Sequence, residues 1–298
     1  MHMRYTYQKM KTFLLPTDFS NTATHAVEYA YSLASQVNAN IVICNAVLLP
    51  SESPQVGLSV WPPEDSEDLL KDSADQLENL ASSIRDTVEK GAFKPAIKLI
   101  HKSGSVYRTI QKILESEPID LVVIGTHETG MLDTLLLGDE ARALIDETTR
   151  PLLLVPPSAE IKPVKKIAFA TDFKDLKKDM ESLETLISIA MPLEAKIYIT
   201  HIYNEEAQSP ELQQTIQKMI NGLSENTNYP NVYFNSFENS SAGSGLEELC
   251  FQGNIDMLAM VHRSHTFIDS LFRGSQTQKI SRHMPIPLLV FPASAKPV

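Results

Sequence analysis

The chain has 298 residues, of which 43% are hydrophobic and 21% charged; 37 acidic side chains against 26 basic ones give a net charge of −11. This length fits about two domains, each large enough to bury its own core. The composition excludes a wholly disordered chain, a collagen-like chain and a small disulfide scaffold. The acidic balance argues against nucleic acid as a partner, but not against a nucleotide held by backbone amides.

No apolar run approaches the roughly 20 residues of a membrane span, and the first residues lack the apolar stretch of a signal peptide. Residues 1–9 are left out of the fold prediction, since Met10 could also serve as a start. Cys44 and Cys250 fit no metal or redox spacing, so both are predicted to be buried, reduced thiols. We therefore expect a cytoplasmic protein without a membrane partner.

The chain contains an internal repeat. Residues 12–19 (Thr-Phe-Leu-Leu-Pro-Thr-Asp-Phe) resemble residues 166–173 (Lys-Ile-Ala-Phe-Ala-Thr-Asp-Phe), and the segment Pro151–Pro156 resembles Pro287–Pro292. A repeat of this length predicts two domains of the same fold. The predicted domains are residues 10–156 and 163–293, joined by a linker at Pro156–Lys162.

Each half alternates short apolar runs with amphipathic stretches, which predicts strands alternating with helices. The expected strands are 12–16, 40–47, 96–101, 121–125 and 152–155, then 166–170, 195–202, 232–235, 257–261 and 288–291. The expected helices are 22–36, 64–89, 106–115 and 139–148, then 176–190, 210–223, 245–250 and 275–282. Uninterrupted apolar runs such as Leu121–Ile124 indicate strands covered on both faces. The predicted fold class is α/β, with two repeated doubly wound domains, each a five-stranded parallel sheet flanked by helices.

Candidate ligand-binding residues follow the first strand of each half. Ligands of such sheets bind beyond the carboxyl ends of the strands, where Asp18 and Asp172 lie. A carboxylate here can accept hydrogen bonds from an adenine or a ribose. It can also close an Asx turn or cap the next helix. The sequence leaves both roles open.

A second candidate element begins at Gly125, after the fourth expected strand, and includes Gly130 and Gly138. Glycines at such a turn let the backbone approach a phosphate, and the helix that follows offers free N–H groups.

From about Met10 to Pro292 the repeat resembles the universal stress protein family in its tandem, two-domain form. The resemblance rests on Pro16-Thr-Asp-Phe-Ser20, the strand Val122–Gly125, the turn Leu135–Gly138 and the closing strand Arg150–Val155. It implies a Rossmann-like domain of the adenine nucleotide alpha hydrolase-like type. It also implies that the two domains pair through their last strands, here within one chain.

Some members of that family bind ATP through Gly, two residues, Gly, nine residues, Gly and then Ser or Thr. The first half keeps Gly125 and Gly138 but has Glu128 and Asp139 at the other two positions, and Gly130 is out of register. Like charges at a phosphate site cost on the order of a few kcal/mol. By this resemblance the first site is disabled for ATP.

In the second half the matching positions are Val261, Ser264, Gly274 and Ser275, of which only the last two fit the pattern. No acid intrudes, and neighbouring arginines suit a phosphate, although they could also be solvated surface residues. The second half is therefore the better candidate for an anion or nucleotide. Its proposed binding residues are Asp172, Arg263, Ser264, Gly274 and Ser275.

The sequence gives little support for a metal site or a catalytic site. No cluster of His, Cys and carboxylates has metal spacing, so no metal is expected. Ser20 and Ser275 have no assigned base, and no nucleophile elbow or Walker loop is present, so no catalytic residue is predicted. The Leu49–Asp65 insertion, which holds Trp61, is either a lid or partner-binding loop or a tolerated surface excursion.

Two functions of different class follow. The first is a non-enzymatic stress-response protein with degenerate nucleotide sites, acting through an unidentified protein partner or self-association such as a homodimer, with a residual anion or nucleotide site in the second half. The second is an ATP- or AMP-binding sensor or slow ATPase that uses the second-half site. The degenerate phosphate turns favour the first. A flavin or nicotinamide enzyme would need glycines after the first strand, which Thr17–Asn21 and Thr171–Lys174 lack.

Overall fold

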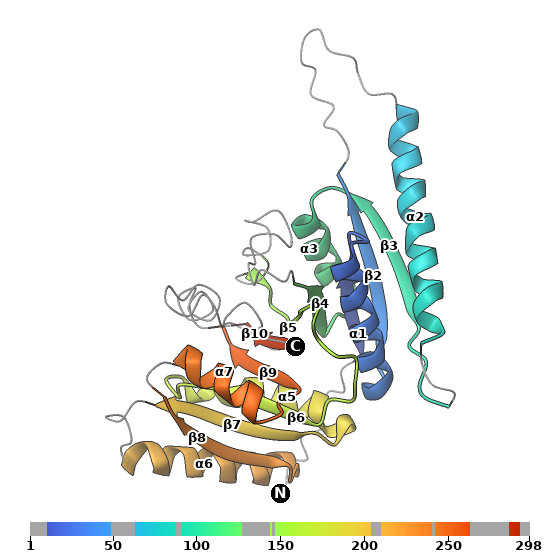
Figure 1. The fold of residues 1–298 in the computed structure, drawn as a ribbon. Coiled ribbons are helices and arrows are strands. Elements are labelled where there is room, and N and C mark those ends of the chain that lie inside the picture. Colours follow the sequence, from blue (N-terminus) through green and yellow to red (C-terminus); the bar gives the residue numbers. More distant parts are fainter. Residues whose placement is uncertain are drawn as a thin grey trace, which may run out of the picture.

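The computed structural model describes residues 11–48, 63–87, 91–126, 144, 147–203, 210–239, 242–262 and 286–292. Within them one ten-stranded sheet runs in the order β3-β2-β1-β4-β5-β10-β9-β6-β7-β8 (Figure 1). The first half supplies β1 (Thr12–Pro16), β2 (Asn40–Val47), β3 (Ile97–Ser103), β4 (Leu121–Gly125) and β5 (Leu152–Val155). The second supplies β6 (Lys166–Ala170), β7 (Lys196–Tyr203), β8 (Val232–Glu238), β9 (Met257–Val261) and β10 (Leu288–Phe291).

The helices separate into two layers. The first half supplies α1 (Asn21–Val37), α2 (Pro63–Arg85) and α3 (Val106–Ser116), and the second supplies α5 (Leu176–Leu193), α6 (Pro210–Thr227) and α7 (Ala242–Gln252). Buried side chains of α1, α2, α5 and α6 form one core on one face of the sheet, and those of α3 and α7 form another on the opposite face. The predicted doubly wound α/β fold is confirmed.

Most predicted strands begin and end at the expected residues. The edge strands are longer than predicted, since β3 continues to Ser103 and β8 to Glu238. The added residues are mostly polar and give no continuous apolar pattern, yet the backbone ladder to the neighbouring strand continues, with Val47 opposite Ser103. Both cysteines are buried thiols, as predicted. The helix predicted at 275–282 and most of that at 139–148 lie outside the described residues.

The two halves join through their last strands. β5 and β10 pair antiparallel, with Leu153 opposite Leu289, while the five strands within each half pair parallel. Phe169 and Phe291 lie with ring centroids 6.3 Å apart, and the core beside them contains residues of both halves. The intrachain pairing that the resemblance implied is therefore present.

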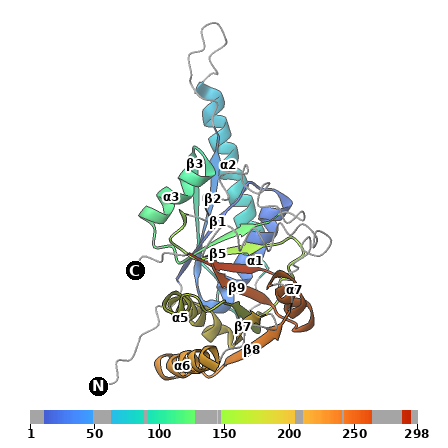
Figure 2. The same ribbon diagram turned by 90° about the vertical axis from the view of Figure 1, so that its left-hand side faces the viewer.

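Helix α2 packs against β2 and β3 and extends past the sheet (Figures 1 and 2). Along the described part of the chain, no helix combines the length and apolar character needed to cross a bilayer.

Candidate functional site

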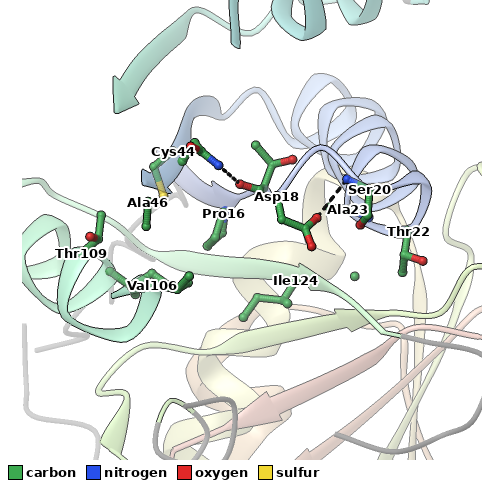
Figure 3. Close-up of a pocket in the computed structure, with 14 residues that line it drawn as sticks. Pro16, Asp18, Ser20, Thr22, Ala23, Cys44, Ala46, Val106, Thr109 and Ile124 are labelled. Carbon is green, nitrogen blue, oxygen red and sulfur yellow. Dashed lines mark hydrogen bonds between the residues drawn. The ribbon is translucent and has the colours of Figure 1, made fainter. Parts of the chain in front are cut away.

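A crevice opens in the first half beyond the carboxyl ends of β1, β2 and β4 (Figure 3). β1 has β2 on one side and β4 on the other, so the crevice lies at the point where the strand order reverses, the usual ligand position in this fold class. The crevice is open to solvent on one side, and the empty space within it and at its open mouth amounts to about 570 Å³. The lining residues are Pro16, Thr17, Asp18, Ser20, Thr22, Ala23, Cys44, Asn45, Ala46, Val106, Thr109, Ile110, Ile124 and Gly125.

The turn after β1 fixes Asp18 at the rim of this crevice. Asp18 Oδ1 accepts a hydrogen bond from the Ser20 N–H at 3.0 Å, so this oxygen closes an Asx turn (Figure 3). Ser20, not Asp18, caps α1, because its hydroxyl accepts from the Ala23 N–H at 3.2 Å. Among the described residues Oδ2 of Asp18 accepts no hydrogen bond. The carboxylate can therefore hold the turn with one oxygen and bind a ligand with the other.

The same turn is strained. Phe19 has φ 62°, in the left-handed region that residues other than glycine rarely adopt. The Phe19 N–H donates to Thr17 Oγ1 at 3.0 Å, which supports this conformation. Strain of this kind persists only where the surroundings over-determine it, and it is common around ligand sites.

One edge of β2 faces the crevice. The Thr17 N–H donates to the Cys44 carbonyl at 2.8 Å, where the β1–β2 ladder ends, but β2 continues to Val47. Because backbone groups alternate in direction along a strand, the N–H and C=O of Ala46 point the same way as those of Cys44, past the end of β1. They offer one donor and one acceptor to a ligand.

The wall opposite consists of α3, which places Val106, Thr109 and Ile110 against the crevice. Cys44 also contributes to the lining, but burial raises the pKa of its thiol to about 12. The thiol therefore stays protonated and is a poor nucleophile at neutral pH. The site offers an apolar wall and hydrogen-bonding groups rather than an activated nucleophile.

Gly125 ends β4 beside the first turn of α1. A Cβ at this position would lie 2.5 Å from the Thr22 carbonyl oxygen and 2.9 Å from its carbonyl carbon. Backbone cannot yield as a flexible side chain can, so a glycine is required here.

We expect Gly125→Ala to lower the free energy of unfolding by about 2 kcal/mol, the typical cost of overpacking, as measured by urea denaturation. Gly222→Ala is the matched control, since a Cβ there meets nothing within 4 Å inside α6. It should be neutral or stabilise by up to about 1 kcal/mol. Equal effects of the two substitutions would contradict the close contact.

The second half repeats the turn with one difference at the carboxylate. Asp172 Oδ1 accepts from the Lys174 N–H at 3.2 Å, and Phe173 has φ 56°. The Lys174 ammonium, however, lies 3.1 Å from Asp172 Oδ2 in an exposed ion pair. The position equivalent to Lys174 in the first half holds Ser20, which has no charge to offer Asp18.

The strand registers show why the crevice differs between the halves. Pro16 lies opposite Cys44 as Ala170 lies opposite Thr200, so Ala46 corresponds to Ile202. Thr109 and Gly245 are each the fourth residue of their helix, α3 and α7. Ile202 Cγ2 would lie 2.8 Å from a Cβ on Gly245, so the isoleucine fills the place that is open beside Ala46.

A second position also holds a larger side chain in the second half than in the first. It is the last residue of the fourth strand. Val261, which is buried, takes the place of Gly125 at the end of β9. The helix after the repeated turn begins one residue later than α1 does, since α5 starts at Leu176 with Asp175 as its cap.

A buried carboxylate lies beneath the second turn. Asp179 is fully buried and accepts a hydrogen bond from Thr171 Oγ1 at 2.7 Å. Burial, and more weakly the charge of Asp175, raise the pKa of Asp179 to about 6, although the Thr171 hydroxyl opposes the shift. In α1 the equivalent residue is His25, whose Nε2 lies 2.9 Å from the linker carbonyl of Ala159.

Of the predicted site residues, Asp18 and Gly125 line the same crevice. Asp172 is on the repeated turn. The other predicted positions lie outside the described residues, and their roles stay predictions. They are Gly130, Gly138, Arg263, Ser264, Gly274 and Ser275, together with the acidic Glu128 and Asp139 at two positions of the ATP pattern. Across the described ranges no three His, Cys, Asp or Glu residues lie close enough to hold a metal ion.

Sequence reasoning missed Asn45, Ala46 and Thr109. None of them belongs to the phosphate pattern on which the prediction concentrated. Aligning the second strands and third helices of the two halves pairs Ala46 with Ile202 and Thr109 with Gly245. The exchange of Ala46 for the larger Ile202 would have indicated that the place beside Ala46 is the more open of the two.

This architecture defines a tandem, doubly wound α/β protein with a crevice at its strand ends. The family model "Universal stress protein family" matches residues 9–156 and 163–292, so the chain belongs to the universal stress protein family.

Three relatives illustrate the likeness. A universal stress protein of Synechocystis is 22% identical over 95% of this chain and 100% of its own length. One from Methanocaldococcus jannaschii is 28% identical over 49% of this chain and 94% of its own length. The crystal structure of a universal stress protein from Archaeoglobus fulgidus shares the fold, with a TM-score of 0.69, 16% identity, and coverage of 95% of this chain and 97% of that one.

Proposed function

We propose that this protein is a non-enzymatic, ligand-binding universal stress protein whose first-half crevice takes the nucleoside part of an adenine nucleotide. The observation that carries the proposal is the crevice itself, with the Asp18 carboxylate at its rim and the Ala46 backbone along its edge. A purine fits an apolar slot with one donor and one acceptor at its end, and ribose hydroxyls can donate to a carboxylate.

The charge of the lining favours a ligand with few phosphates. Among the described lining residues Asp18 carries the only charge, and it is negative. Adenosine or AMP can place a neutral base and ribose there. The family's phosphate pattern assigns the triphosphate to the segment with Glu128 and Asp139, which lies outside the described residues, so we propose that ATP binds more weakly.

A binding role without catalysis is supported by the groups nearby. Ser20 uses its hydroxyl oxygen as the cap of α1, and Asp18 is the one carboxylate in the described lining, which contains no His, Lys or Glu. We propose that the bound ligand alters association with a protein partner or a second copy of the chain, which keeps the stress-response hypothesis. Cytoplasmic localisation is part of the same proposal.

Isothermal titration with adenosine, AMP and ATP tests the assignment. We expect AMP and adenosine to bind the wild type and Asp18→Ala to weaken them at least about tenfold, since a hydrogen bond to a charged group is worth about 1.5–3 kcal/mol. Asp172→Ala is the matched control and should leave the affinity unchanged. Loss of binding from the Asp172 substitution alone would assign the ligand to the second half. Absence of heat with all three ligands would overturn the proposal.

A further inference from the structure

A buried chain of hydrogen bonds joins α2 to the turn that carries Asp18. Ser73 Oγ donates to Asn45 Oδ1 at 2.8 Å, and Asn45 Nδ2 donates to the Thr17 carbonyl at 2.7 Å. The Asn45 and Ser73 side chains are buried, with 9% and 4% of their surfaces exposed. Since a carbonyl can only accept, the amide of Asn45 has one satisfactory orientation, with its NH₂ toward Thr17. Both ends of this amide are thus in use.

The Thr17 carbonyl belongs to the peptide unit that leads into Asp18. A parallel ladder continued past Cys44 would direct the next N–H of β2 toward this carbonyl. The Asn45 side chain donates to the Thr17 carbonyl in place of that backbone N–H. The chain can therefore leave the sheet at Thr17 with this carbonyl hydrogen-bonded. The relay therefore fixes where the strained turn departs and where the Asp18 carboxylate lies.

The other end of the relay lies at the first buried side chain in the part of α2 whose side chains the structure describes, from Glu67 onward. This side chain is Ser73, and Leu77, one turn later, is also buried. The N-terminal end of α2 extends past the sheet (Figure 2). Any shift of α2 across the sheet would strain the Ser73–Asn45 bond before it reached the deeper core.

We propose that Ser73 and Asn45 are positioning residues that hold the Asp18 carboxylate at the crevice, so that the seating of α2 sets the affinity of the site. This inference rests on the proposed function. The second half offers an independent solution to the same requirement, since His201 Nδ1 lies 3.0 Å from the Thr171 carbonyl at the position equivalent to Asn45. A side-chain contact to this carbonyl thus recurs in both halves with different residues.

Titration of AMP into Ser73→Ala tests the relay without touching the crevice, since Ser73 does not line it. We expect a three- to tenfold weaker affinity, the range for one lost hydrogen bond, and recovery in Ser73→Thr, which keeps the hydroxyl. In the Asp18→Ala background the Ser73→Ala substitution should not lower AMP affinity further, because the carboxylate that Ser73 helps to position is absent. An equal loss in both backgrounds would overturn the proposal.

His201→Ala separates positioning from stability. It breaks the equivalent contact in the second half, so it should lower the unfolding midpoint much as Ser73→Ala does, while AMP affinity stays at the wild-type value. Affinity that followed stability in both variants would show a purely structural role and overturn the inference.

A ligand-free measurement keeps the two proposals distinguishable. In Asn45→Asp an acceptor oxygen faces the Thr17 carbonyl in place of a donor. We expect hydrogen exchange of the Phe19 and Ser20 amides, both bonded within the turn, to accelerate about tenfold or more. Unchanged exchange would overturn the relay even if AMP binds; absence of AMP binding with accelerated exchange would overturn only the proposed function.

Discussion

Filling the first-half crevice with the residues of the second half is expected to abolish ligand binding. The double substitution Ala46→Ile with Thr109→Gly reproduces the Ile202–Gly245 contact, in which the isoleucine occupies the open place. A ligand would have to displace this side chain, and we expect at least about a hundredfold loss of AMP affinity, on the order of 3 kcal/mol. Calorimetric titration measures it.

Thr109→Gly alone is the control for this experiment. It carries the cost of a glycine inside α3, up to about 1 kcal/mol of stability, but leaves the crevice open. Its AMP affinity should stay within about threefold of the wild type. Full binding by the folded double variant would show that the ligand lies elsewhere.

Neutralising the buried Asp179 is expected to stabilise the protein at neutral pH. Burial raises the pKa of this carboxyl from 3.8 to about 6, so the folded state binds its proton more tightly than the unfolded state. Its ionisation therefore lowers the free energy of unfolding as pH rises from about 4 to about 6. A shift of about two pKa units corresponds to about 3 kcal/mol.

Asp179→Asn keeps an oxygen that can accept from Thr171 and removes the charge. In urea denaturation the variant should match the wild type near pH 4 and exceed it by up to about 3 kcal/mol at pH 7. Asp75→Asn, on the exposed side of α2, should show no such pH-dependent difference. A variant less stable than the wild type at pH 7 would mean that the charge of Asp179 is needed by the fold.

Much of the fold could be predicted because the strands are short apolar runs with clear ends. Leu121–Gly125 and residues 167–170 are buried on both faces, so their sequences carry an unmixed apolar signal. The edge strand β8 extends beyond its prediction because its end mixes the polar Ser236 and Glu238 with Phe237, and the pairing of these residues depends on β7. Local sequence does not contain that information.

The site was harder to predict than the fold. Asp18 could be expected at the strand ends, but a sequence cannot tell an Asx turn from a ligand contact, and here the two oxygens permit both. The openness of the crevice depends on side-chain volume at Ala46 and Thr109, which belong to no motif. The interpretation that favoured the second half weighed phosphate chemistry, whereas the strand registers place the larger Ile202 and Val261 there.

The most direct test of the account is photo-crosslinking with 8-azido-AMP followed by peptide mapping of the labelled chain. The account predicts that the label falls on the first half, in peptides that contain β2 or α3, and that excess AMP prevents it. Asp18→Ala should reduce the labelling and Asp172→Ala should not. AMP-protected labelling confined to the second half would contradict the central claim that the open first-half crevice is the nucleoside site.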